Sequence, residues 1–284
     1  MIDIQSMSFS FGVVDLFRDL SIEFKPGRVY GLLGKNGAGK TTLFKLIGGL
    51  LQANTGQPNV LGFNSFTRPP EMLQELFYIP ETYYLPPVTI RQFESLHAPF
   101  YPKYDSAVLR EHLAELELDE MQRLNTLSYG MSKRFMLAFG LATQSRILLL
   151  DEPTNGLDIP SKRVFRKLLA GGITEDRLFI IATHQIKEVE TILDHLVFVD
   201  QGRILLESAV DQIASRLVFR KVSELDPARS VLYREEIAGG YAVIEANESD
   251  EESPVDLEFL FNAVLDSGEA VQQLLSQDKE VKIG

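Results

Sequence analysis

A glycine-rich stretch near the N-terminus most constrains what this chain can fold into. Its residues fit the pattern Gly, four residues, Gly-Lys-Ser/Thr, and read Gly34-Lys35-Asn36-Gly37-Ala38-Gly39-Lys40-Thr41-Thr42. The apolar run Val29–Leu33 precedes them as a buried strand, and apolar residues at helical spacing follow. Glycines here let successive backbone N–H groups point at phosphate oxygens, and the helix N-terminus adds about +0.5 elementary charge. The pattern predicts a nucleoside triphosphate site between a strand and a helix.

Four side chains carry the chemistry expected at this site. Lys40 is placed to reach the terminal phosphates, and the Thr41 hydroxyl is placed to ligate Mg²⁺. A second pattern, the apolar run 147–150 followed by Asp151-Glu152, supplies carboxylates at a strand end, where ligands collect in an open parallel sheet. We expect Asp151 to hold magnesium and Glu152 to orient or deprotonate the attacking water. A general base of this kind contributes about 10²–10⁴ in rate.

Bulk composition narrows the class of protein. The 284 residues are enough for about two domains, and 45% apolar with 24% charged residues is typical of globular proteins. We expect no membrane-spanning segment and no secretion signal. We also expect no disulfide, since the chain has no cysteine. A net charge of −12 argues against a nucleic-acid partner. Residues 208–284 hold 16 acidic and 7 basic residues, a net of −9, and are expected to form a small appended domain.

The order of strand and helix patterns predicts an α/β fold with an insertion. Residues 2–11 alternate as a strand with Met7, Phe9 and Phe11 on one side, and a short strand is expected from Val60 to Phe63. Residues 89–141 are mostly helical, which indicates an inserted subdomain. The alternation then resumes, with a helix expected through 186–193, a hairpin at 196–206, and strands near 231–233 and 241–244.

Three further motifs carry a resemblance to a known family. Leu127-Ser128-Tyr129-Gly130-Met131 opens a helix ahead of the Asp151 strand, Asn155-Gly156-Leu157-Asp158 follows that strand, and His184 follows the next one. Their order and spacing over residues 2–207 resemble the nucleotide-binding subunits of ATP-binding cassette (ABC) transporters. The family's signature is Leu-Ser-Gly-Gly-Gln, so Tyr129 and Met131 depart from it, whereas Ser128 and Gly130 agree. The resemblance identifies His184 as the switch histidine and 155–158 as the loop that touches the other subunit.

The resemblance implies a fold and a division of the chain. Residues 1–207 would form a P-loop ABC ATPase cassette with a RecA-like parallel core, an antiparallel β subdomain and an inserted helical subdomain at about 85–143. Residues 208–284 would form a small α+β extension. Two ATP molecules with Mg²⁺ would lie between two subunits. The phosphate loop of one subunit would face Ser128, Gly130 and Asp158 of the other, in a homodimer or with a homologue.

Other positions carry alternatives. Phe11 occupies the place of the aromatic residue on which family members stack adenine, and stacking is favoured over the alternative of a core side chain on an alternating strand. Glu81 falls where many members carry a magnesium-ligating glutamine, and a carboxylate there would ligate Mg²⁺ but add negative charge. Residues 82–100 would form the surface that meets the membrane partner, and they equally fit a packed loop. Residues 254–264 resemble the amphipathic C-terminal segment of exporter subunits, or any amphipathic helix that closes a small domain.

The substitutions in the signature resemble those of bacterial exporters whose ATP-binding and membrane halves are separate chains. Such exporters handle drugs, antibiotics, lipids or polysaccharides. The resemblance implies an ATP-hydrolysing, cytoplasmic subunit at the inner face of the cell membrane, bound to an integral-membrane subunit. The rival hypothesis is a soluble ABC-type ATPase that acts in assembly or another non-transport process. A regulatory subunit that binds ATP without turnover is disfavoured, since Glu152 and His184 are both present.

Overall fold

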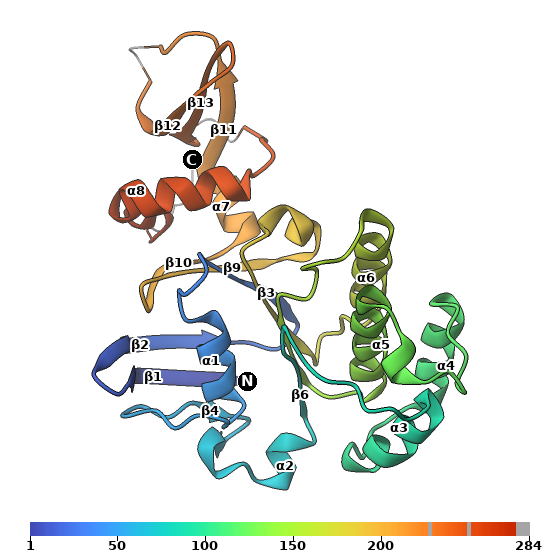
Figure 1. Cartoon of the computed structure of the whole chain (residues 1–284). Helices are drawn as coiled ribbons and strands as arrows, with labels where there is room; N and C mark the ends of the chain where they lie inside the picture. The colour runs from blue at the N-terminus through green and yellow to red at the C-terminus, as the bar shows by residue number, and fades with distance from the viewer. Residues whose placement is uncertain (227–228, 249–250, 277–284) are drawn as a thin grey trace.

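Three β-sheets organise the chain, which the computed structural model describes over residues 1–226, 229–248 and 251–276 (Figure 1). The largest sheet has the strand order β10-β9-β3-β8-β7-β6, and its pairs run parallel except for β9 with β10. Its strands are β3 (Arg28–Leu33), β6 (Leu76–Ile79), β7 (Ile147–Asp151), β8 (Leu178–Thr183), β9 (His195–Asp200) and β10 (Arg203–Ala209). The glycine-rich loop of residues 34–42, which follows β3, and Asp151, at the end of β7, therefore belong to the same sheet.

Both faces of this sheet are covered, as its apolar strands require. Every residue of β7 and β8 is buried, which is typical of a parallel sheet between two layers. Leu149 and Ile180 join one apolar cluster, whereas Leu148 and Phe179 join the other. This alternation follows from the two-residue period of a strand. The sheet thus separates two cores, and its edge at the carboxyl ends of the strands is left for polar side chains.

The antiparallel sheet has the order β2-β1-β4-β5, with β1 at Ile2–Phe11, β2 at Val14–Phe24, β4 at Asn59–Val60 and β5 at Phe63–Asn64. The single strand predicted from Val60 to Phe63 was wrong. Leu61 and Gly62 both have positive φ, 55° and 89°, and make the two-residue turn of a hairpin. Phe11, at the end of β1, is 55% exposed, although Phe9 on the same strand is buried.

Helices fill the layers on either side of the sheets. The α-helices are α1 (Lys40–Ile47), α2 (Pro70–Leu73), α3 (Ile90–His97), α4 (Ser106–Glu115), α5 (Tyr129–Ala142), α6 (Ile159–Gly171), α7 (Val210–Arg216) and α8 (Leu257–Ser276). Short 3₁₀ helices lie at η1 (Ser65–Thr67), η2 (Ala98–Phe100), η3 (Leu124–Thr126), η4 (Ile186–Glu188) and η5 (Glu190–Ile192). Over the described residues, none of the helices is long and apolar enough to cross a membrane.

The helical block expected at 89–141 contains α3, α4 and α5, which lie together at one side of the parallel sheet (Figure 1). Thr89 begins α3 with a capping box, because its hydroxyl accepts from Gln92 N while the Gln92 side chain accepts from Thr89 N. Asp105 caps α4. The helices share a buried aromatic cluster in which the Phe93 ring lies 5.5 Å from Phe135 and 5.1 Å from Phe139.

The helix predicted through 186–193 was wrong. The structure has two separate 3₁₀ turns there, η4 and η5, with non-helical backbone at Val189, whose φ is −126°. Val189 is fully buried in the core. β-Branched residues are frequent in this segment, and they lose side-chain freedom in a helix. Helical spacing of apolar residues therefore marked a buried turn rather than a regular helix.

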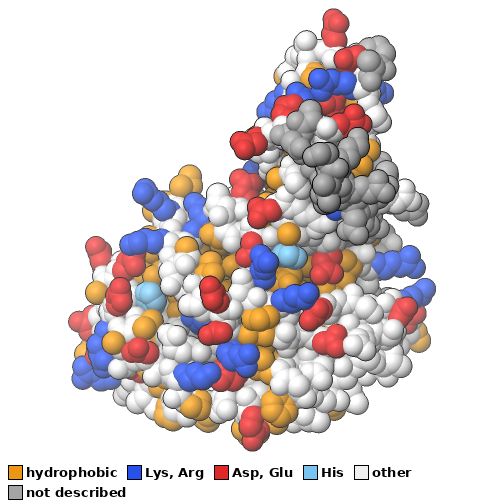
Figure 2. Space-filling view, turned by 180° about the vertical axis from the view of Figure 1, so that it is seen from behind, with side chains coloured by type: hydrophobic (Ala, Val, Ile, Leu, Met, Phe, Trp, Pro, Cys, Tyr) orange, Lys and Arg blue, Asp and Glu red, His pale blue; other side chains and the backbone are white. Residues whose placement is uncertain are grey.

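The C-terminal strands form a third sheet, of order β11-β13-β12, which stands above the larger body (Figures 1 and 2). Its strands are β11 (Leu217–Val222), β12 (Val231–Ile237) and β13 (Gly240–Ala246). β12 and β13 match the predicted strands, whereas β11 was not predicted. Helix α8 overlaps the predicted amphipathic segment 254–264, but begins at Leu257 and continues to Ser276. Residues 277–284 of the expected extension lie outside the described residues.

Helix α8 packs on the large sheet as well as on the small one. The Phe261 ring lies 5.2 Å from that of Phe198 on β9, and Leu260 is fully buried in the same apolar cluster. Gln212 of α7 donates to the carbonyl of Leu275 at 2.9 Å, which holds the far end of the helix. One apolar cluster therefore continues from the parallel sheet into α8.

Replacement of Leu260 by alanine tests this continuity. Because the side chain is fully buried, Leu260→Ala is expected to lower the free energy of unfolding by about 2–5 kcal/mol. Urea unfolding, followed by circular dichroism and by the loss of nucleotide binding, should show the main transition at a lower urea concentration. The exposed Leu50 is the matched control, and Leu50→Ala should change stability by less than about 0.5 kcal/mol. An unchanged main transition in Leu260→Ala would mean that α8 is not part of this core.

Candidate functional site

The phosphate loop joins the end of β3 to the start of α1, as predicted. Gly37 and Gly39 have φ of 83° and 105°, in the left-handed region that favours glycine. Gly34 is required for a different reason, since a Cβ there would lie 2.2 Å from the carbonyl oxygen of Val199. Gly39 is the N-cap of α1 and has no side chain to occupy the first-turn N–H groups. The loop therefore leaves a helix N-terminus open to an anion.

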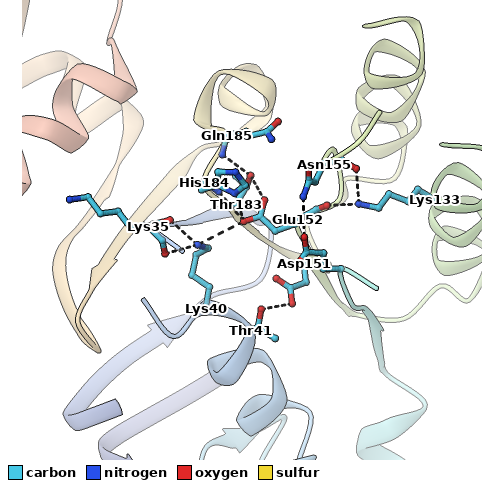
Figure 3. A network of polar contacts seen from close by, with 12 residues as sticks. Lys35, Lys40, Thr41, Lys133, Asp151, Glu152, Asn155, Thr183, His184 and Gln185 are labelled. Atoms are coloured by element: carbon cyan, nitrogen blue, oxygen red, sulfur yellow. Dashed lines mark hydrogen bonds and ion pairs between the residues drawn. The ribbon is translucent and has the colours of Figure 1, made fainter. Parts of the chain in front are cut away.

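Lys40 folds back over the loop from which it arises (Figure 3). Its Nζ donates to the carbonyl oxygens of Gly34 at 2.7 Å and Lys35 at 3.1 Å, and lies 3.8 Å from Glu152 Oε1. The side chain is only 6% exposed. Burial lowers the pKa of Lys40, and the carboxylates of Glu152 and Asp151 oppose that shift. The ammonium group is held at the mouth of the loop and is ready to exchange a carbonyl contact for an anion.

Thr41 and Asp151 meet across the sheet edge, 110 residues apart in the chain. The Thr41 hydroxyl donates to Asp151 Oδ2 at 2.8 Å, and the Tyr78 hydroxyl lies 3.3 Å from the same oxygen. Asp151 Oδ1 is buried and has no hydrogen-bond partner among the described residues. Burial raises the pKa of Asp151, hydrogen bonds from Thr41 and Tyr78 oppose the shift, and the carboxylates of Glu152 and Glu81 add to it. The nucleotide-free site thus keeps a carboxylate that its surroundings disfavour as an anion.

Glu152 is oriented by the residues that follow the neighbouring strand. Thr183 Oγ1 donates to Oε2 at 3.0 Å, and the backbone N–H of His184 donates to Oε1 at 3.1 Å. His184 Nδ1 lies 2.8 Å from Oε1 as well. These contacts exist because β7 and β8 pair in parallel and end side by side, with Asp151 opposite Ala182. The structure therefore brings Glu152, His184 and Lys40 into one cluster (Figure 3).

A cavity of about 410 Å³ opens over this cluster. The predicted residues that line it are Phe11, Asn36, Gly37, Gly39, Lys40, Thr41, Thr42, Glu81, Glu152 and His184, with Leu16 and Asn155 in addition. Glu81 Oε1 accepts a hydrogen bond from the Asn155 side chain at 3.0 Å, so this carboxylate is already engaged at the cavity wall.

Ser128, Gly130 and Asp158 do not line this cavity; they lie at the starts of α5 and α6. Ser128 is the N-cap of α5, with its hydroxyl 3.3 Å from Met131 N, and Asp158 is the N-cap of α6, 2.9 Å from Ser161 N. The two helix starts are neighbours, because a Cβ at Gly130 would contact the side chains of Leu157 and Ser161. These two helix starts therefore lie outside the set of residues that lines the cavity beside the phosphate loop.

Three residues of the site were missed at the level of sequence. Tyr78 contacts the carboxylate of Asp151 and Thr183 contacts that of Glu152, and both stand at or near the ends of their strands. Lys133 donates from α5 to the carbonyl oxygens of Glu152 and Asn155 (Figure 3). Position at the end of a strand beside the acidic strand was the signal available for Thr183. No comparable signal marks Lys133, which Arg134 follows directly on α5.

Asp151 provides a test of the electrostatics of the site. When the pKa of a carboxyl is higher in the folded than in the unfolded protein, ionisation of that carboxyl lowers the stability of the fold. The loss of stability is complete above the folded pKa and absent below the unfolded pKa of about 3.9. Asp151→Asn is therefore expected to raise the melting temperature of the nucleotide-free protein at pH 7, with the gain disappearing as the pH falls towards 4. Thermal unfolding across this pH range measures it.

The matched control is Asp158, whose pKa is lowered by its hydrogen bonds with Ser161. Asp158→Asn should give no gain at pH 7, because the ionised form is favoured in that folded environment. Equal melting temperatures of Asp151→Asn and the wild type at every pH would show that Asp151 is not strained in the nucleotide-free protein.

Comparison with known proteins agrees with this geometry. The sequence profile of the ABC transporter family matches residues 17–155. The chain is 31% identical to the bacitracin transport ATP-binding protein BcrA of Bacillus licheniformis, over 69% of this chain and 66% of that protein. It is 30% identical to the Nod factor export ATP-binding protein I of Burkholderia orbicola, over 80% of this chain and 78% of that protein.

The fold is also that of a solved ATP-binding subunit of an ABC transporter. That structure superposes with a TM-score of 0.67 at 23% identity and covers 75% of this chain and 91% of its own. Such a likeness bears on the fold, which is the α/β cassette that the sequence predicted. Together with the relative that shares 30% identity over most of both chains, these findings show that the chain belongs to the ATP-binding, ATP-hydrolysing subunits of ABC transporters.

Proposed function

We propose that this subunit powers an exporter whose membrane-spanning part is a separate chain. The relative named for Nod factor export supports export as the direction, and the relative named for bacitracin transport supports a role in transport. Drugs, antibiotics, lipids and polysaccharides are the substrate classes that the signature with Tyr129 and Met131 suggests. The single observation that carries the mechanism is the cluster of Lys40, Glu152 and His184 in one cavity.

The cavity fits ATP from its base to its terminal phosphate. Backbone N–H groups of residues 34–42 and the α1 N-terminus would hold the phosphates, with Lys40 on the terminal ones. The exposed Phe11 ring, which lines the same cavity, would stack on adenine. Such stacking is worth about 1–3 kcal/mol per base and discriminates little between bases. The 55% exposure of Phe11 supports stacking over a place in the core.

The residues beside the phosphates fit a magnesium ion. Asp151 Oδ1 is an acceptor without a partner among the described residues. The hydroxyl of Thr41 is close by, because it donates to the other oxygen of the same carboxylate, Oδ2. Thr41 and Asp151 would hold Mg²⁺, with Glu81 a further candidate because it lines the same cavity. When bound, the ion neutralises charge on the phosphate oxygens. A magnesium ion would also offset the unfavourable free energy of burying the negative charge of Asp151.

Hydrolysis would use the cluster at the ends of β7 and β8. Glu152 would accept a proton from a water molecule while the oxygen of that water attacks the γ-phosphorus. The bond between the γ-phosphorus and the oxygen that bridges it to the β-phosphate would break, which gives ADP and phosphate. Thr183 and the His184 N–H fix both carboxylate oxygens, so the base is oriented before the substrate arrives. With Nδ1 turned to Glu152, His184 keeps Nε2 for the γ-phosphate, whose presence it would sense.

A second subunit would complete each site. Ser128, Gly130 and Asp158 lie away from the cavity, at two adjacent helix N-termini that suit a phosphate oxygen. In a dimer, with a homodimer as the simplest form, these residues would face the phosphate loop of the other copy. ATP binding would then close the dimer and hydrolysis would reopen it, and each step would shift the membrane partner between conformations.

The proposed place of action is the cytoplasmic face of the cell membrane. The segment 82–100, which includes the strongly exposed Tyr84 and Phe100, is the proposed contact with the integral-membrane subunit. Acidic and basic side chains intermingle on the rear face of the body (Figure 2), and the net charge of −12 disfavours binding to nucleic acid.

Glu152→Gln tests the assignment of the base. The amide is close in size to the carboxylate but cannot accept the proton, so kcat should fall by about 10²–10⁴. Nucleotide affinity, measured with a fluorescent ATP analogue, should stay within a few-fold of the wild type. Size-exclusion chromatography with ATP should show a trapped dimer. Hydrolysis by Glu152→Gln at the wild-type rate would remove Glu152 from this role.

A pull-down with the same variant tests the transporter hypothesis. Tagged Glu152→Gln, with ATP, would be incubated separately with detergent-solubilised native membranes and with cytosol. Recovery of a multi-spanning protein from the membrane fraction is expected, and a Lys40→Ala chain that cannot retain ATP is the control for nucleotide dependence. Recovery of soluble partners alone would contradict a transporter and favour an ABC-type ATPase of assembly.

A further inference from the structure

Lys133 is a buried cation that the proposed chemistry leaves unused. It lies on α5, and its side chain is 2% exposed. Its Nζ donates to the carbonyl oxygen of Glu152 at 2.7 Å and to that of Asn155 at 3.0 Å (Figure 3). Its hydrogen-bond acceptors are thus two backbone carbonyls rather than a carboxylate.

A lysine is an expensive residue for this position. Removing an ammonium group from water disfavours its charged form, and burial lowers the pKa of Lys133, with the carboxylates of Glu81, Glu152 and Asp151 opposing the shift. An apolar side chain of similar length would fill the same volume without that loss. The ammonium group therefore has a use beyond filling space, and its two hydrogen bonds show where to look for it.

Both carbonyls belong to the loop that carries the catalytic base. Glu152 has a φ of 44°, a left-handed conformation that is strained for a non-glycine residue. Its N–H donates to the Ala182 carbonyl at 2.8 Å, while its own carbonyl accepts from Lys133. The backbone of Glu152 is thus held from both sides, which sets the direction in which its carboxylate points.

The ring of Tyr129 completes the link to the helix start. Tyr129 and Lys133 are four residues apart on α5, so they share a face, and Nζ lies 4.9 Å from the ring centroid. The ring also packs on the loop after Asn155, because a Cβ at Gly156 would lie 2.8 Å from it. The first turns of α5 are therefore packed directly against the loop 152–156.

We propose that Lys133 is a positioning residue that sets the catalytic geometry of Glu152. It ties the strained backbone of Glu152 to α5, whose N-terminus would meet the nucleotide of the second subunit. Arrival of that phosphate at Ser128 would then be transmitted through α5 and Lys133 to the base of the chain's own site. This inference rests on the proposed role of Glu152 as the base.

A double-mutant cycle between Lys133 and Glu152 tests this. Lys133→Met keeps the length and apolar volume but leaves both carbonyls without the donor. Its kcat for ATP should fall by about 10- to 100-fold, since small misplacements of a catalytic group have effects of that size, while KM changes by less than about two-fold. The control is Lys167→Met on α6, whose lysine is exposed and pairs with Glu115; it should leave both constants unchanged.

The double variant separates positioning from a general effect on the fold. If Lys133 acts through Glu152, Lys133→Met should cause no further loss of kcat in the Glu152→Gln background. An additive loss, or a wild-type kcat in Lys133→Met, would overturn the proposal. Lys133→Gln is carried through the same cycle, so that a folding defect in Lys133→Met does not decide the outcome. Its side chain is one bond shorter than that of lysine but still carries N–H donors.

The cycle also distinguishes this proposal from the one on which it rests. Wild-type hydrolysis by Glu152→Gln alone would refute the role of Glu152 whatever Lys133 does. A strong loss in Glu152→Gln with an additive effect of Lys133→Met would keep the base and reject its positioning by Lys133.

Discussion

Parallel pairing of β3, β8 and β7 is the constraint on which the rest of the structure depends. Because their register places Leu33 beside Thr183 and Asp151 beside Ala182, the strands end together and their following residues share one edge. The phosphate loop, the acidic pair and His184 come from distant parts of the chain, and this edge is the place where they can meet. Apolar residues on both faces of β7 and β8 hold the register, so the chemistry of the site depends on the packing beneath it.

The same edge concentrates groups whose burial destabilises the fold. Burial shifts the pKa of Lys40 and Lys133 downward and that of Asp151 upward, so each is held in surroundings that disfavour its charge. Strained backbone at Glu152 adds to this. Two apolar cores on either side of the sheet supply the compensating stability. In the proposed mechanism these groups would be in place before a nucleotide and a metal ion bind, which is the electrostatic preorganisation that catalysis requires.

Much of this fold follows from local sequence, and the departures have physical causes. The loop of residues 34–42 and the acidic end of β7 are predictable because each motif lies within one strand-to-helix junction. Residues 186–193 were predicted as a helix because periodicity does not separate a helix from successive buried turns. Lys133 and Tyr78 escaped prediction because their partners are 19 and 73 residues away. Only the packing of α5 and the order of strands brings them together.

The contact of Phe261 with Phe198 has a consequence for how such subunits diverge. Because the ring on α8 fills space against a strand of the parallel sheet, a change of size on one partner calls for a compensating change on the other. Lys187, three residues after His184, is also paired with Glu258 of α8 at 2.6 Å. A chimera that acquires the C-terminal segment of another subunit would therefore have to acquire the matching face of β9 and of the turns after His184 with it.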